Sequence, residues 1–317
     1  MSVITKGSLP KGRNDALPKQ GGGRQGRRYL YALIFLLPGM LLFFGLLLLP
    51  LTNSFYYSLF DWNGFGPPVD FVGTANYERL LNHDVFHSAI RNSLVIVVLS
   101  IVVQLPLALG LALLVGRGEL RGRGIFRTIL FIPYVFSEIL TAYIWSYAFH
   151  PQDGLVNLLF GSVVPGYQNV LWLADRNVVV LAIFMVITWK YFGLHMILYL
   201  AALQGVPKEL EDAARVDGAT EPQIIRKVTV PLISPTIRLT IYLSVLGSFQ
   251  QFVLIWILTQ GGPANASQVI STYLYKFGIL GVRLGFGSAV AVMLFTFTLT
   301  FSLLYQFFFM RRDYVLE

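Results

Sequence analysis

Residues 29–51 read YLYALIFLLPGMLLFFGLLLLPL, 23 positions without a charged side chain. A single helix needs about 20 apolar residues to cross a bilayer, so this stretch predicts a membrane-spanning helix. Residues 288–310, SAVAVMLFTFTLTFSLLYQFFFM, meet the same criterion near the other end of the chain. Two such stretches predict a protein that crosses the membrane more than once.

The composition supports several further crossings. Of the 317 residues, 55% are hydrophobic and 13% are charged, whereas about a quarter of a soluble domain is charged. This composition excludes a disordered or collagen-like chain, and the absence of cysteine excludes a disulfide scaffold. We predict an all-α, polytopic integral membrane protein with six transmembrane helices, at residues 29–51, 93–115, 128–149, 178–203, 239–258 and 288–310.

The net charge of +8 is explained by topology. With a cytoplasmic amino terminus, the segments inside the cell hold 18 of the 24 Lys and Arg residues but 9 of the 16 acids. The positive-inside rule requires this distribution, so both termini are predicted to be cytoplasmic in a multi-pass plasma-membrane protein. A nucleic acid is therefore not an expected partner, and the lipid bilayer is.

The predicted organisation is one transmembrane domain, residues 29–310, between two cytoplasmic tails. The basic tail, residues 1–28, is expected to be disordered and is too long to be a cleaved signal peptide with the apolar run after it. Residues 311–317 form the second tail. Within the domain, residues 52–92 are the larger outer segment and residues 204–238 the longest cytoplasmic loop.

Enzymatic motifs are absent from the sequence. It contains no GxxxxGK[ST] phosphate loop and no HExxH pair, and its four histidines lack metal-ligand spacing. We therefore predict no catalytic residue, no metal site and no cofactor bound by this chain. If transport is coupled to energy, another polypeptide must supply that energy.

The loop at residues 204–238 is the most informative segment. Pro207 suits the start of a helix over residues 208–216, which ends at Asp217-Gly218. Thr220 and Gln223 form a T-x-x-Q capping box that begins a second helix running to Pro231. The residues alone fit a docking element for a cytoplasmic partner and a pair of helices lying on the lipid surface equally well. A DNA-binding helix-turn-helix is disfavoured because the loop lies between two spans.

Residues 209–231, ELEDAARVDGATEPQIIRKVTVP, resemble the EAA loop of permease subunits of binding-protein-dependent ABC importers. That pattern is EAA, three residues, Gly, nine residues and then I-x-L-P. Asp212, Ala213, Ala214 and Gly218 match its first half, with Asp in place of Glu. Val228, Val230 and Pro231 match its second half, with Val in place of Ile and of Leu.

The resemblance extends to the maltose, lactose and glycerol-phosphate permease group, first-permease type. It covers Asn76-Tyr77, FIPY at residues 131–134, GLVN at 154–157 and FQQFVLIWILTQGGP at 249–263. It implies carbohydrate import with a second homologous permease, two ATPase subunits that bind ATP and Mg, and an extracytoplasmic solute-binding protein. It also implies that the loop helix docks on an ATPase subunit, through the coupling residues Glu211, Asp212, Ala213, Ala214, Asp217, Gly218 and Pro231.

Polar residues inside the spans predict the substrate pathway. Glu138 and Lys190 lie roughly 15–18 Å along their helices, near the middle of a bilayer core about 30 Å thick. Charges at that depth are costly and mark a cavity or a structural pair, so both functions remain open for these two residues. Hydroxyls, a carboxylate and aromatic rings at helical spacing suit a sugar, which predicts the pathway residues Tyr134, Glu138, Thr141, Trp145, Tyr191, Ser244, Ser248 and Gln251.

Each single Ser, Thr or Tyr among these can instead be structural, and His195 is expected to be a hydrogen-bonded interior residue. The resemblance adds support for Tyr134, Glu138, Ser244 and Ser248, which match sugar-contacting positions of the maltose transporter. A secondary transporter is the alternative function, although such transporters usually have two matching halves. The sequence does not identify the sugar, whether it is phosphorylated, the ATPase, or which permease holds most substrate contacts.

Overall fold

The computed structural model describes residues 22–117 and 122–310. Internal contacts divide the chain into two units, Met1–Asn53 and Ser54–Glu317. Most of the predicted tail at residues 1–28, and the whole of the tail at residues 311–317, lie outside the described residues.

The first unit is one helical segment. Helix α1 (Gly22–Leu42), a π-helical stretch (Phe43–Leu48) and helix α2 (Leu49–Tyr57) follow one another directly, and α2 ends in the second unit. The part Tyr31–Tyr57 is long and apolar enough to cross a membrane. Its apolar side chains are exposed all round, as for Phe35 at 84%. A surface of this kind suits lipid as the solvent.

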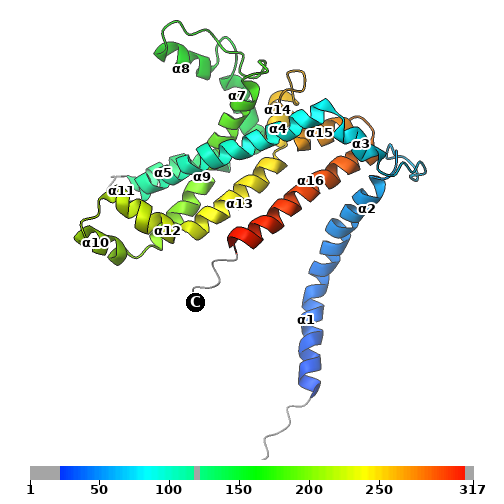
Figure 1. Cartoon of the computed structure of the whole chain (residues 1–317), viewed down its shortest axis with the longest axis horizontal. Helices are drawn as coiled ribbons and strands as arrows, with labels where there is room; N and C mark the ends of the chain where they lie inside the picture. Colours follow the sequence, from blue (N-terminus) through cyan, green and yellow to red (C-terminus); the bar gives the residue numbers. More distant parts are fainter. Residues whose placement is uncertain (1–21, 118–121, 311–317) are drawn as a thin grey trace, which may run out of the picture. The chain divides into compact units, whose positions relative to one another are not determined.

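Three further helical segments of the second unit are long enough to cross a membrane. The first comprises α4 (Asp84–Leu99), a π-helical stretch (Ser100–Gln104) and α5 (Leu105–Arg117). The second is α9 (Val179–Gln204), and the third is α16 (Leu284–Tyr305) with its π-helical continuation (Gln306–Met310). α4, α13 (Ser234–Gln250) and α16 run side by side in Figure 1.

The expected span at residues 128–149 is not one straight helix. α6 (Arg123–Val135) and α7 (Glu138–Ala148) meet at an angle of 99°. Phe136 and Ser137 are extended, and the Ser137 Oγ accepts the backbone N–H of Leu140 at 3.2 Å. Ser137 is thus an N-cap that begins a second helix inside the apolar stretch. If each bent pair of helices is counted as one span, the described residues contain the six predicted crossings.

The expected span at residues 239–258 is also displaced. α13 begins at Ser234 and ends at Gln250, and α14 (Val253–Thr259) follows after a break at Gln251 and Phe252. The loop before α13 contains α10 (Lys208–Val216), α11 (Glu221–Ile224), a π-helical stretch (Ile225–Thr229) and α12 (Val230–Leu232). A bend of 70° at Ile233 separates this helical stretch from α13.

Helix α9 lies at the centre of the second unit, where it packs against α5, α6, α7 and α13. It is apolar on every side, and half of its residues are buried. Gly193 allows the closest of these contacts, because a Cβ at this position would lie 2.5 Å from the carbonyl oxygen of Leu130 on α6. α6 and α9 therefore touch through their backbones.

The remaining elements are short. They are α3 (Ala75–Leu81), α8 (Leu155–Val163), and α15 (Ile270–Tyr273) with its π-helical continuation (Leu274–Ile279). Asn76 holds the outer segment through bonds of 2.9 Å to the carbonyls of Ser58 and Phe60. Asn157 accepts the Trp172 Nε1–H and the Tyr167 hydroxyl, each at 2.8 Å. These two motif asparagines thus have structural roles.

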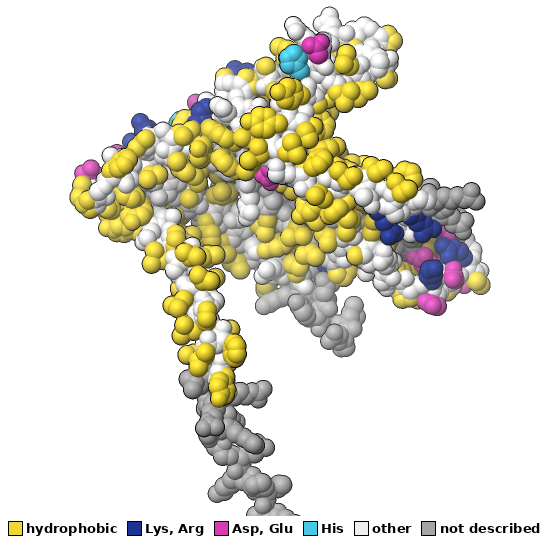
Figure 2. All heavy atoms as spheres, turned by 180° about the vertical axis from the view of Figure 1, so that it is seen from behind, with side chains coloured by type: hydrophobic (Ala, Val, Ile, Leu, Met, Phe, Trp, Pro, Cys, Tyr) yellow, Lys and Arg dark blue, Asp and Glu magenta, His cyan; other side chains and the backbone are white. Residues whose placement is uncertain are grey.

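Charged side chains are concentrated at the end of the second unit that carries α10. Figure 2 shows Lys, Arg, Asp and Glu side chains gathered there, whereas hydrophobic side chains cover the flanking helices. This contrast separates the loop from the helices that face lipid.

Candidate functional site

A cavity of about 350 Å³ lies between the Ser100–Gln104 stretch, α7, α9 and α13. Five of the eight predicted pathway residues line it: Glu138, Tyr191, Ser244, Ser248 and Gln251. The helices thus bring together residues that are more than a hundred positions apart in the chain. Their contact with substrate stays a prediction.

Glu138 is the first residue of α7 and lines the cavity. The N-terminal end of a helix carries a partial positive charge, which stabilises a carboxylate there. The Tyr191 hydroxyl of α9 donates to the Glu138 carboxylate. Helix end and hydroxyl together account for a carboxylate within an apolar segment.

Lys190 is buried, with 4% of its surface exposed, and its ammonium group is directed at the break between α6 and α7. Its Nζ donates to the carbonyl of Phe136 at 2.5 Å and approaches that of Tyr134 at 3.5 Å. These carbonyls form the C-terminal end of α6, where a cation is favourable. No direct hydrogen bond or ion pair joins Glu138 and Lys190 among the described contacts, although their charges still attract one another through space. Each charge is also stabilised at a different helix end.

The α13 side of the cavity carries hydroxyls and an amide. Ser248 donates to the carbonyl of Ser244 at 2.8 Å, and its Oγ lies 3.5 Å from that of Ser100. Gln251 follows the last residue of α13, and the Ser271 hydroxyl donates to its backbone carbonyl. The Gln251 Oε1 is buried and has no hydrogen-bond partner among the described residues.

Four polar lining residues were not predicted as pathway residues: Ser100, Gln104, His195 and Gln250. Ser100 and Gln104 lie in a π-helical stretch, in which the N–H of Leu105 bonds to the carbonyl of Ser100 five residues earlier. Pro106, which follows this stretch, has no N–H to donate. Ser100 and Gln104 are polar residues spaced i, i+4 within an apolar span, which is the signal that could have identified them.

The other three predicted pathway residues do not line the cavity. The Tyr134 ring lies next to Tyr191, with 6.3 Å between centroids. Thr141 is fully buried on α7. The Trp145 ring packs against the rings of Phe149, at 5.1 Å, and Trp189, at 5.8 Å. Their place in the substrate pathway stays a prediction.

The two predicted loop helices form, the second as the consecutive elements from Glu221 to Leu232. α10 has the predicted bounds, and Gln223 accepts the backbone N–H of Thr220 at 2.8 Å, as a capping box requires. Gly218 joins the helices with a φ of +83°. A Cβ there would meet no atom within 4 Å, so the requirement for glycine is conformational rather than steric.

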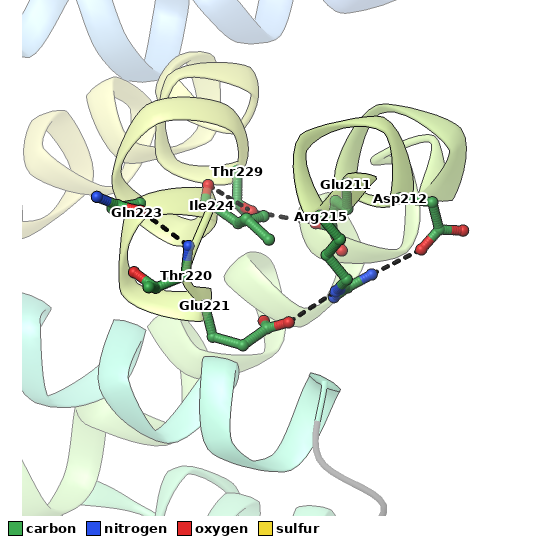
Figure 3. A network of polar contacts seen from close by, with 8 residues as sticks. All are labelled: Glu211, Asp212, Arg215, Thr220, Glu221, Gln223, Ile224 and Thr229. Atoms are coloured by element: carbon green, nitrogen blue, oxygen red, sulfur yellow. Dashed lines mark hydrogen bonds and ion pairs between the residues drawn. The ribbon is translucent and has the colours of Figure 1, made fainter. Parts of the chain in front are cut away.

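Polar contacts hold the two loop helices together, as Figure 3 shows. Arg215 donates to Asp212 at 2.6 Å and to Glu221 at 2.7 Å, while Thr229 donates to Glu211 at 3.1 Å. The hydrogen bond to Glu221 raises the pKa of the Arg215 guanidinium above its ordinary value, and Asp212 adds to this. The predicted contacts of Glu211 and Asp212 with an ATPase subunit stay predictions.

The loop leaves apolar side chains on its surface. Val216 is 88% exposed and Leu210 is 47% exposed, both on α10. The other predicted coupling residues are exposed or half-buried: Ala213, Ala214, Asp217 and Pro231. Exposed valine and leucine fit docking on a partner and contact with lipid alike, so docking on an ATPase subunit stays a prediction.

A scan of the chain against protein-family models matches residues 104–313 to "Binding-protein-dependent transport system inner membrane component". A probable ABC transporter permease of Bacillus subtilis is 34% identical over 87% of this chain and 94% of its own length. The diacetylchitobiose uptake permease of Streptomyces coelicolor is 31% identical over 90% of this chain and 86% of its own. The lactose transport permease of Rhizobium radiobacter is 31% identical, with coverages of 77% and 81%.

A crystal structure of a bacterial ABC transporter for the acidic polysaccharide alginate matches with a TM-score of 0.79. It is 26% identical and covers 93% of this chain and 99% of its own. The family model, the sequence relatives and the structural match point to the same family. The chain therefore belongs to the family of inner membrane components of binding-protein-dependent transport systems.

Proposed function

We propose that this chain is the permease subunit of an ATP-driven ABC importer that moves a sugar or oligosaccharide across the plasma membrane by alternating access. The observation that carries the proposal is the covalent connection between loop and cavity. The loop joins α9 to α13, and both helices line the cavity. A displacement of the loop is therefore transmitted along two of the cavity's walls.

The polar groups of the cavity suit a sugar. Glu138 accepts hydrogen bonds, while Ser244 and Gln251 can both donate and accept, which matches the dual character of sugar hydroxyls. The Tyr191 ring lies at the same wall and offers an aromatic face. The relatives named for lactose and diacetylchitobiose support a carbohydrate substrate.

Four partners complete the proposed transporter. They are a second homologous permease, two ATPase subunits that bind ATP and Mg, and an extracytoplasmic solute-binding protein. The exposed apolar side chains of α10 provide the docking surface for an ATPase subunit. The family description supports dependence on a binding protein, and this chain itself binds no cofactor in the proposed mechanism.

Both termini are proposed to be cytoplasmic. The basic residues of the loop and of the segments near both ends support this orientation through the positive-inside rule. The loop then faces the ATPase subunits, and the segment of residues 52–92 faces the binding protein.

The test is ATP-driven uptake by the complete importer in proteoliposomes. Gly218→Val forces a β-branched residue to a φ of +83°, whereas Gly218→Asn places there a residue that tolerates this conformation. We expect the valine variant to assemble but to lose most of the binding-protein-stimulated ATPase activity and uptake, and the asparagine variant to retain both. Wild-type coupling in the valine variant would refute the role of the loop. Uptake that needs no ATP and is abolished by an uncoupler would favour the secondary transporter.

A further inference from the structure

The charges that face the cavity are of one sign. Among the described residues that line it, Glu138 is the only carboxylate and there is no Lys or Arg. The other polar lining residues carry hydroxyl, amide and imidazole groups and come from the Ser100–Gln104 stretch, α9, α13 and the residue after α13: Ser100, Gln104, Tyr191, His195, Ser244, Ser248, Gln250 and Gln251.

The nearest cation on α9 does not serve the cavity. Lys190 is not part of the lining, and its ammonium group donates to the carbonyl of Phe136 at 2.5 Å. Its charge is therefore committed to the C-terminal end of α6. Lys190 still attracts Glu138 through space, but among the described residues no cationic side chain lines the cavity or bonds to that carboxylate.

Amide and hydroxyl groups favour a ligand that both donates and accepts. Gln104 is 2% exposed and Gln251 is 7% exposed, and the buried Gln251 Oε1 has no partner among the described residues. A buried acceptor of this kind needs a donor, which a sugar hydroxyl supplies and a ligand carboxylate does not.

We propose that this cavity accepts neutral sugar units and rejects sugars that carry a carboxylate or a phosphate. The proposal rests on the proposed function of sugar import and specifies its substrate class. Relatives by sequence are named for neutral sugars, whereas the matching crystal structure concerns an acidic polysaccharide, so the comparisons leave this choice open. The negative charge of Glu138 in the cavity favours a neutral sugar over an acidic one.

The physical reason is the cost of burying an anion beside a carboxylate. An anionic sugar loses hydration on entering the cavity and meets no Lys or Arg side chain among the described lining residues. Repulsion by Glu138 adds to this cost, because like charges at short range in a low dielectric interact strongly. A neutral sugar incurs neither cost and donates to the same carboxylate.

The absence of cysteine from the chain permits a direct test. Gly247 lines the cavity, and a Cβ at this position meets no atom within 4 Å, so Gly247→Cys introduces one reporter thiol without a clash. Leu243→Cys, at another lining position, is a second reporter in case the first fails to fold. The complete importer in detergent is labelled at pH 8 with a cationic and an anionic methanethiosulfonate, and an importer without the reporter gives the background.

We expect the cationic reagent to react faster than the anionic one by on the order of tenfold, after correction for their reactivity with a free thiol. Glu138→Gln should reduce this ratio several-fold. Glu78→Gln removes an exposed carboxylate of α3 that does not line the cavity, and should leave the ratio unchanged. Equal reaction rates, or a ratio that Glu138→Gln does not alter, would overturn the proposal.

Uptake assays test the charge selectivity separately from the proposed function of sugar import. Each of three neutral disaccharides, maltose, cellobiose and α-1,4-galactobiose, is compared with its uronate counterpart. Uptake of a neutral sugar at least tenfold faster than its uronate is the expected result. Equal uptake of both overturns the charge selectivity but leaves sugar import standing. ATP-driven uptake of a non-carbohydrate solute overturns sugar import, while the labelling ratio still reports the cavity's charge.

Discussion

Replacing Lys190 by methionine tests how the bent span is stabilised. Methionine keeps the length and apolar character of the side chain but leaves the carbonyls of Phe136 and Tyr134 without the ammonium group. A hydrogen bond to a charged group contributes roughly 1.5–3 kcal/mol, and an unsatisfied buried acceptor costs about 1–3 kcal/mol. Removing a buried cation recovers part of its desolvation cost. We expect a net destabilisation of about 2–3 kcal/mol.

The measurement is the thermal unfolding of the purified complex, followed by fluorescence-detected size exclusion after heating. A loss of this size should lower the midpoint by roughly 5 °C, because the shift per kcal/mol falls as the size of the unfolding unit grows. Lys190→Gln, which retains one donor, should lie between the wild type and the methionine variant.

The matched control is Glu138→Gln, which removes the other charge. Because Glu138 bonds to Tyr191 and not to Lys190, its amide should leave the midpoint almost unchanged while uptake slows. A structural ion pair predicts a different pattern, in which either single change costs about 3–5 kcal/mol and the double change restores stability. That pattern would refute the assignment of each charge to its own helix end.

Three further changes test other contacts. Gly193→Ala places a Cβ 2.5 Å from the Leu130 carbonyl and should cost about 1–3 kcal/mol in thermal unfolding, whereas Gly110→Ala, with no atom within 4 Å, should cost nothing measurable. Ser137→Ala removes the N-cap of α7 and should cost about 1 kcal/mol by the same assay, with Ser137→Asp retaining the cap. Arg215→Gln removes the contacts to Asp212 and Glu221 that hold the loop helices together, so binding-protein-stimulated ATPase activity should fall. Because these contacts are exposed, the unfolding midpoint should stay unchanged. A lowered midpoint would instead show that Arg215 stabilises the whole fold.

The parts of the fold that depend on local signals could be predicted from the sequence. α10 matches its predicted bounds because the segment begins after Pro207 and ends at Asp217-Gly218. The bend in the third span was missed, although Ser137 followed by Glu138 is a helix-start signal. A long apolar stretch outweighed that signal, since length alone was enough to predict one crossing.

The sequence indicated polar residues that the helices bring together at the cavity, but not which atoms they bond. Rise along a helix places Glu138 and Lys190 at similar positions along their spans and says nothing about orientation across helices. The bonds of Lys190 to the carbonyls of Tyr134 and Phe136 were not predictable, because the break between α6 and α7 that frees these carbonyls was not predicted. Gln104 was not predicted because a neutral polar residue costs less in an apolar span than a charge does, and is therefore a weaker sign of a cavity.

The 99° bend between α6 and α7 also constrains where this protein can deform during transport. Two adjacent residues of α9 secure its two sides: Lys190 binds the end of α6, and Tyr191 binds the start of α7. The bend is thus fixed to α9 and moves with it as one rigid body. Changes of backbone angle are then expected elsewhere, and the 70° bend at Ile233 separates the loop helices from α13, which the Tyr199–Thr240 hydrogen bond joins to α9 seven residues beyond the bend. Amide hydrogen exchange around Ile233, where the N–H bonds to the Thr229 carbonyl at rest, should accordingly accelerate more on going from rest to turnover than exchange around Ser137 does.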